Sequence, residues 1–194
     1  MSGMIARSLL ATSLTSVIVV AAVGTAASAG TYVGLGIGSS SVSDNGANDY
    51  VPDGRSARLM VGMRFGNISA EAAYTGYGLV KQNSGNSFDS RGLSAALKLS
   101  IPLGNNFEAY GRGGLMRTWL TLPGDAKPAG LTSYSGDGYT VSAGFEYRLN
   151  LVLAGASLFV DYTRNTATLS ADMPGYQPLD QSASLWTLGL LVSL

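Results

Sequence analysis

The sequence predicts an all-β protein: an eight-stranded antiparallel up-and-down transmembrane β-barrel preceded by a cleavable signal peptide. Three observations predict this fold. Charged residues make up only 12% of the 194 residues, about half the share found in a soluble globular domain. Segments in which apolar and polar residues alternate recur along the chain. The connections between these segments alternate between short and long, which is typical of barrels that cross a membrane.

The first 29 residues have the features of an export signal. Arg7 is the only charged side chain among the first 43 residues, and an apolar stretch from Leu9 to Val23 follows it. Ala27-Ser28-Ala29 then forms the small-x-small pattern of a cleavage site. We therefore expect residues 1–29 to be a signal peptide and residues 30–194 to form the barrel domain. An uncleaved anchor is the alternative, but the apolar stretch is shorter than the span of about 20 residues that a helix needs.

Period-two alternation predicts the strands. The strands are expected near residues 31–39, 55–65, 68–79, 91–101, 107–120, 139–149, 156–163 and 184–194. Short connections are expected at residues 66–67, 102–106 and 150–153, and long ones at residues 40–54, 80–87, 121–136 and 167–183. With both ends of the barrel on the short-turn side, the number of strands must be even.

Aromatic residues provide a check, because they did not enter the placement of the strands. Two girdles are expected: Trp119, Tyr139, Tyr162 and Trp186 at the outer rim, and Phe65, Phe107 and Tyr147 at the inner rim. Amphipathic rings collect at membrane interfaces. The alternative is a soluble barrel of lipocalin type, which would turn its apolar face inward. The Gly, Ser, Ala and Thr of the polar face fit a crowded lumen better than a hydrated exterior.

The polar faces of the predicted strands carry nine ionisable side chains. They are Arg58, Arg64, Glu71, Lys98, Glu108, Arg112, Glu146, Arg148 and Asp161. Side chains fill the interior of an eight-stranded barrel, so these charges are expected to form ion pairs, since a buried lone ion costs several kcal/mol. Two interpretations remain: a polar plug of ion pairs, or an ion path whose pairs exchange partners.

Three segments carry a resemblance to a known family. They are RLMVGMRFGNISAEAAYTGYG (58–78), LSAALKLSIPLGNNFEAYGRGGLMRTW (93–119) and VSAGFEYRL (141–149), and they resemble the small outer-membrane barrels of the OmpA and OmpX type. The resemblance implies that Glu71, Lys98, Arg112 and Glu146 belong to an interior ion-pair network whose rearrangement is proposed to gate a small pore. The seventh strand departs from the family pattern, because an apolar residue stands where an interior arginine is expected.

Enzymatic activity is not expected. Outer-membrane palmitoyltransferases, deacylases and omptin proteases rely on His for acid–base chemistry, and the sequence contains no His. No catalytic residue, cofactor or metal ligand is therefore assigned; Asp44, Asp49 and Asp53 lack the dense oxygen ligands of a calcium loop. A formal net charge of zero gives no indication of a nucleic-acid partner.

The expected location is the bacterial outer membrane, and the expected partners follow from it. They are membrane lipid, lipopolysaccharide phosphates near Arg91, Arg117 and Arg164, and the assembly machinery that reads the alternating last strand, here ending in Leu194. Long loops on a rigid scaffold favour a structural or surface-interaction role, with a host or surface ligand bound by the loops. A small low-conductance channel gated by the interior ion pairs is the alternative function.

Overall fold

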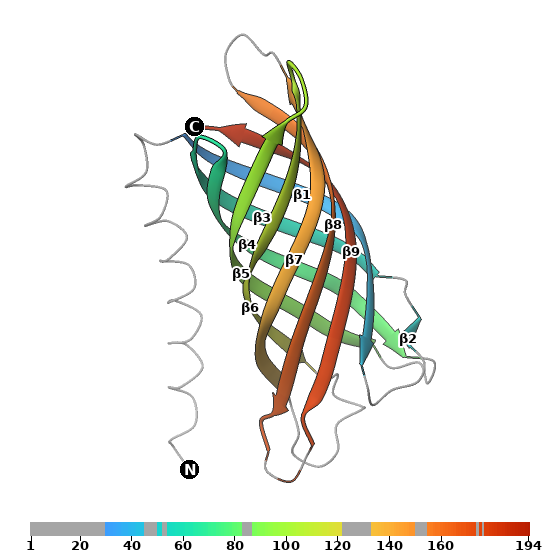
Figure 1. Ribbon diagram of the computed structural model, residues 1–194. Helices are drawn as coiled ribbons and strands as arrows, with labels where there is room; N and C mark the ends of the chain where they lie inside the picture. Colours follow the sequence, from blue (N-terminus) through green and yellow to red (C-terminus); the bar gives the residue numbers. More distant parts are fainter. Residues whose placement is uncertain are drawn as a thin grey trace, which may run out of the picture.

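The structure is a computed structural model that describes residues 30–44, 50–51, 54–82, 87–121, 133–149, 155–173, 175 and 177–194. These residues form nine strands (Figure 1): β1 (Thr31–Asp44), β2 (Tyr50–Val51), β3 (Gly54–Phe65), β4 (Ile68–Gln82), β5 (Ser87–Pro102), β6 (Phe107–Thr121), β7 (Ser133–Leu149), β8 (Ala156–Ala171) and β9 (Leu179–Ser193). A helix long and apolar enough to cross a membrane does not occur in the described part of the chain. The predicted signal peptide, residues 1–29, lies outside the described residues.

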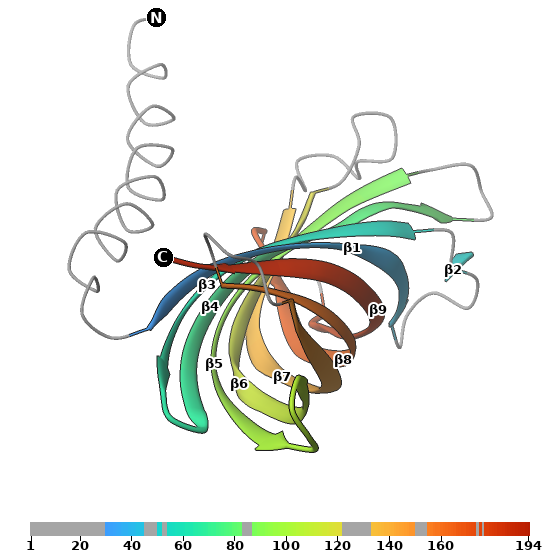
Figure 2. The ribbon, with the colours of Figure 1, turned by 90° about the horizontal axis from the view of Figure 1, so that it is seen from above.

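Eight of the strands close into an antiparallel barrel, which confirms the predicted fold. From β3 to β9 each strand pairs with the next one in sequence, and β1 pairs with both β3 and β9. Figure 2 shows the strands curving around a common interior. The two-residue strand β2 pairs only with the end of β4. Full closure leaves the barrel without an unpaired edge.

The strand register sets the tilt of the barrel. Followed from Val33 through all eight strands, the paired residues return to β1 at Ser43, ten residues further along. A stagger of this size requires the strands to incline by roughly 40° to the barrel axis, an inclination visible in Figure 1. Eight strands at this tilt leave an interior that side chains can fill.

Both ends of the barrel lie on the short-turn side, as predicted. The backbone N–H of Leu194 donates to the carbonyl oxygen of Thr31 at 2.9 Å, which joins the start of β1 to the end of the chain. The β3–β4 turn has only two residues between the paired Phe65 and Ile68, and its Gly66 has a φ of 62°. Glycine adopts this left-handed conformation without steric cost.

The strands are longer than predicted at the long-loop end. β1 continues to Asp44, β7 begins at Ser133, and β8 and β9 enclose only the connection between Ala171 and Leu179. The prediction was wrong there because the two faces exchange their polarity: beyond this point the outward residues are polar and the inward residues include apolar ones, although the alternation continues. In β8 beyond Tyr162, the exposed outward residues are Arg164, Thr168 and Ser170, and the buried inward ones include Ala167 and Leu169. The barrel therefore continues past its apolar outer band.

One irregularity occurs towards the long-loop end of β4. The pairing of β4 with β5 shifts register between Gly76 and Leu79, and Gly78 there has a φ of 73°. A Cβ atom on Gly78 would lie 2.4 Å from the carbonyl oxygen of Arg55. Both the conformation and the close approach of β3 thus require glycine at this bulge.

Candidate functional site: the lumen

The structure brings all nine charged residues of the predicted polar faces together inside the barrel. Seven are buried, while Arg64 and Arg148 are partly exposed at the short-turn end. Neighbours along the wall often carry like charges, since Lys98 pairs in register with Arg112 and Glu108 with Glu146. Like charges directly opposite on a sheet repel. Most of the ion pairs among these nine residues therefore join strands that are not neighbours, and only Arg148–Glu108 and Lys98–Glu71 join adjacent strands.

Asp161 and Glu71 lie at the centre of the network. The Arg112 guanidinium lies 2.8 Å from Asp161 and 2.7 Å from Glu71, and Arg58 lies 3.3 Å from Asp161. The Tyr110 hydroxyl donates to Asp161 at 3.1 Å. All these groups are buried, so hydrogen bonds and ion pairs replace the water that these charges lost.

Lys98 lies between two carboxylates. Its Nζ atom is 2.7 Å from Glu146 Oε2 and 3.7 Å from Glu71 Oε1. The same ammonium group lies 4.3 Å from the centroid of the Tyr110 ring, a favourable cation–π distance. Glu71 also accepts a 2.5 Å hydrogen bond from Tyr32. Lys98 thus connects the central cluster to the groups at the short-turn end.

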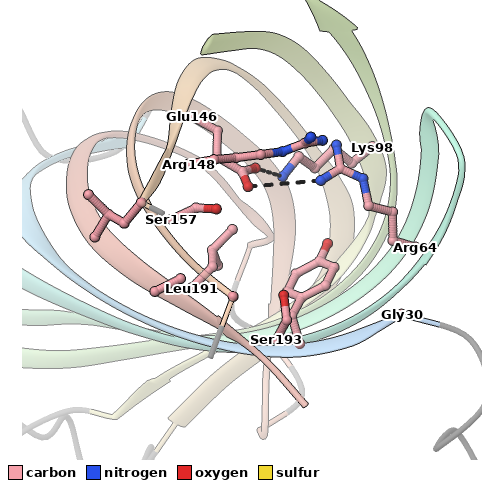
Figure 3. Close-up of a pocket in the computed structure, with 12 residues that line it drawn as sticks. Gly30, Arg64, Lys98, Glu146, Arg148, Ser157, Leu191 and Ser193 are labelled. Carbon is pink, nitrogen blue, oxygen red and sulfur yellow. Dashed lines mark hydrogen bonds and ion pairs between the residues drawn. The ribbon is translucent and has the colours of Figure 1, made fainter. Parts of the chain in front are cut away.

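At the short-turn end, two arginines share one carboxylate. Arg64 and Arg148 both form ion pairs with Glu108, and Arg64 also lies 4.0 Å from Glu146. Beside them is a cavity of about 380 Å³, lined in part by Arg64, Lys98, Glu146 and Arg148 (Figure 3). With these contacts all nine charges belong to one continuous network, with five positive and four negative members.

Between the network and the long loops, the lumen is packed mainly by apolar side chains, with buried polar ones such as Thr118, Asn165 and Gln181 among them. One buried cluster contains Val42, Tyr77, Met116, Ala183 and Leu185, and a second contains Leu120, Tyr134, Ala167 and Leu169. Tyr77 accepts a 2.7 Å hydrogen bond from Asn165. The gap lined by Tyr77, Met116, Thr118 and Asn165 has no room for a water molecule. A closely packed layer therefore lies between the charged network and the long loops.

The outer surface carries the aromatic residues that the sequence placed in two girdles. Phe65, Phe107, Tyr139, Tyr147, Tyr162 and Trp186 are exposed, and Trp119 is half-buried. Phe107 and Tyr147 have ring centroids 5.0 Å apart near the short turns, and Tyr162 and Trp186 are 5.1 Å apart nearer the long loops. Leu35, Leu97, Leu115 and Leu188 are also exposed. The outward face is thus a broad apolar band with aromatic rings towards both ends.

A match to a family model establishes the family to which the chain belongs. It is described as the outer membrane protein beta-barrel domain and matches residues 9–192. The chain belongs to this family. Its location is accordingly the bacterial outer membrane, and the outward apolar band is the surface that meets lipid. A search of curated proteins found no match.

Solved structures of small outer-membrane barrels have the same fold. Neisserial surface protein A is 17% identical, with a TM-score of 0.61 over 84% of this chain and 97% of that one. Ail of Yersinia pestis, solved with the heparin analogue sucrose octasulfate, is 14% identical, with a TM-score of 0.52 over 86% and 99%. OprG of Pseudomonas aeruginosa is 17% identical, with a TM-score of 0.50 over 86% and 96%.

Several lumen residues of this outer-membrane barrel were not singled out from the sequence. Tyr32 and Tyr110 lie on predicted inward faces, and their hydroxyls serve the network. Leu185 and Leu191 were exceptions to the expected polar face, and both are buried inside the barrel. The sequence did contain the information needed to find them: the position of a residue in the period-two alternation determines whether its side chain faces the lumen or the lipid, whatever its polarity.

Proposed function

We propose that the protein is a closed outer-membrane scaffold whose lumen is plugged and whose long-loop end serves surface interactions. The observation that carries the proposal is the two-layer filling of the lumen. One layer is the network of nine charges, and the other, nearer the long loops, is the close and mainly apolar packing around Tyr77 and Met116. An ion would have to break paired charges and then cross an apolar constriction without water, and both steps cost several kcal/mol.

Planar-bilayer recordings test the plug. The wild-type protein purified from outer membranes is expected to give no discrete currents. The double variant Met116→Ala/Leu185→Ala, which removes two side chains of the apolar layer, is expected to give rare openings, because only the barrier of the paired charges then remains. Discrete openings of the wild type, from protein shown to be folded and inserted, would overturn the proposal.

A low-conductance ion path is the second candidate function, and one observation favours it. Lys98 has Glu146 at 2.7 Å and Glu71 at 3.7 Å, so a small displacement of its ammonium group would exchange one carboxylate partner for the other. If the wild type conducts, the variant Lys98→Ala distinguishes the mechanism. A gate made by this exchange predicts altered open times in the variant, whereas unchanged currents would place the path elsewhere.

The surface role that we propose includes contact with lipopolysaccharide phosphates. Arg55, Arg91, Arg117 and Arg164 are exposed, and on its strand each lies on the long-loop side of an apolar outward residue such as Leu93 or Leu115. Guanidinium groups bind phosphate by paired hydrogen bonds. Arg91 and Arg117 have acidic neighbours, Asp89 at 2.5 Å and Asp137 at 3.6 Å, so the two other arginines are the better test.

Thermal unfolding in vesicles provides that test. Lipopolysaccharide is expected to raise the unfolding temperature of the wild type above its value in neutral phospholipid. The increase should shrink in the variant Arg55→Gln/Arg164→Gln. An undiminished increase would show that these arginines do not contact lipopolysaccharide.

We also propose that the protein is not an enzyme, because the described acids of the lumen are engaged with arginine or lysine rather than with a nucleophile.

A further inference from the structure

The charged network leaves an unfilled cavity at the short-turn end of the lumen. Its volume is about 380 Å³, and its walls come from both ends of the barrel chain and from β3, β5, β7 and β8 (Figure 3). Arg64, Lys98 and Arg148 converge on one side together with Glu146, and the small polar residues Ser157 and Ser193 lie on other walls. The cavity therefore offers polar donors from several directions.

The charges around this cavity do not balance. In the central cluster, Arg58 and Arg112 are matched by Glu71 and Asp161. The remaining members of the network are three cations, Arg64, Lys98 and Arg148, and two carboxylates, Glu108 and Glu146. The surplus positive charge of the lumen thus lies beside the cavity. A charge held in such a partly desolvated site attracts a counter-ion more strongly than one on an open surface.

The arginines also retain free donors. The Arg148 side chain is 49% exposed, and within the described part of the chain its only hydrogen bond is to Glu108. Arg64 donates to Glu108 and to the carbonyl oxygen of Gly66. Because a guanidinium group has five N–H donors, both residues can bind a further acceptor without giving up Glu108.

We propose that this cavity is a binding site for a small oxyanion, a phosphate or carboxylate group, held by Arg148 and Arg64. The one carboxylate in the lining, Glu146, is already paired, with Lys98 at 2.7 Å and Arg64 at 4.0 Å. A planar guanidinium fork matches the oxygens of phosphate and carboxylate. The opening at the short-turn end places the site on the inner side of the outer membrane, opposite to the loops.

The test uses the protein purified from outer membranes and inorganic phosphate as the probe. Side-chain Nε–H signals of arginine are followed by NMR while phosphate replaces chloride at constant ionic strength, and acetate is titrated in parallel. Saturable shifts of the Arg148 and Arg64 signals are expected. Their strength with phosphate compared with acetate shows which group the cavity prefers.

Variants separate a built site from general attraction of anions. Arg148→Gln is expected to weaken phosphate binding by roughly tenfold or more, as the loss of a charge-assisted hydrogen bond predicts. Ser170→Glu, which changes the net charge by the same amount on the exposed outer face at the far end of the barrel, should leave binding unchanged. Arg148→Lys keeps the charge and should give an intermediate affinity. Absence of saturation with both anions, or equal affinity in wild type and Arg148→Gln, would overturn the proposal.

Discussion

Asp161 shows how a single residue stabilises the interior. It is 1% exposed and receives contacts from Arg58, Arg112, Tyr110 and Thr163. Arg58 has no other carboxylate partner among the described residues. Removing the charge of Asp161 would therefore leave a buried guanidinium group without its counter-ion.

Asp161→Asn is expected to lower the free energy of unfolding by about 3–5 kcal/mol, the usual cost of breaking a buried ion pair on one side. Asp89→Asn is the control, because Asp89 pairs with Arg91 at the surface and such pairs contribute about 0–1 kcal/mol. Urea unfolding in lipid vesicles, followed by the fluorescence of the two Trp residues, measures both. Equal losses would mean that the interior network is not desolvated.

At the scale of the strand, β6 carries two adjacent glycines with opposite surroundings. A Cβ on Gly114 would lie 2.1 Å from the carbonyl oxygen of Ala95, whereas a Cβ on Gly113 would meet nothing within 4 Å. Gly114 faces the crowded interior and Gly113 faces outward. The absence of a side chain is therefore a packing requirement at only one of the two positions.

Gly114→Ala is expected to destabilise the barrel by about 1–3 kcal/mol, because the added methyl group overpacks the contact between β5 and β6. Gly113→Ala should be neutral or slightly stabilising, since alanine restricts the unfolded chain. The free energy of unfolding in vesicles compares the two variants. A larger loss for Gly113→Ala would contradict the assignment of the two faces.

The faces of the strands could be predicted from the sequence, and their ends could not. Alternation identifies the inward side chains because its period is two, so the nine lumen charges were found together. It does not show where the apolar outer band stops, and the reversed polarity of β8 beyond Tyr162 hid strands that continue to Ala171. The partners of each charge depend on the register of all eight strands, as the contact of Lys98 in β5 with Glu146 in β7, two strands away, shows.

The whole molecule is oriented by its outer band. Leu97 is 64% exposed and lies in the middle of the lipid-facing part of β5, while Ser170 lies on the outward face of β8 beyond that band. Leu97→Arg is expected to destabilise the barrel in vesicles by about 2–4 kcal/mol, the cost of a cation at the bilayer midplane. Ser170→Arg should have little effect, and a similar loss in both variants would contradict the position of the band.

The most direct test of the plugged barrel is the accessibility of single cysteines, because the sequence contains no native Cys. Three single-cysteine variants are compared. Ser157→Cys lies in the cavity at the short-turn end. Thr118→Cys lies in the lumen nearer the long loops, where Thr118 is 1% exposed, and Ser170→Cys lies on the exposed outer face. A water-soluble maleimide is applied to each folded protein in detergent. The account predicts rapid labelling at positions 157 and 170, and labelling at position 118 only after unfolding. Labelling at position 118 as fast as at position 157 would show that water passes through the lumen and would contradict the plug.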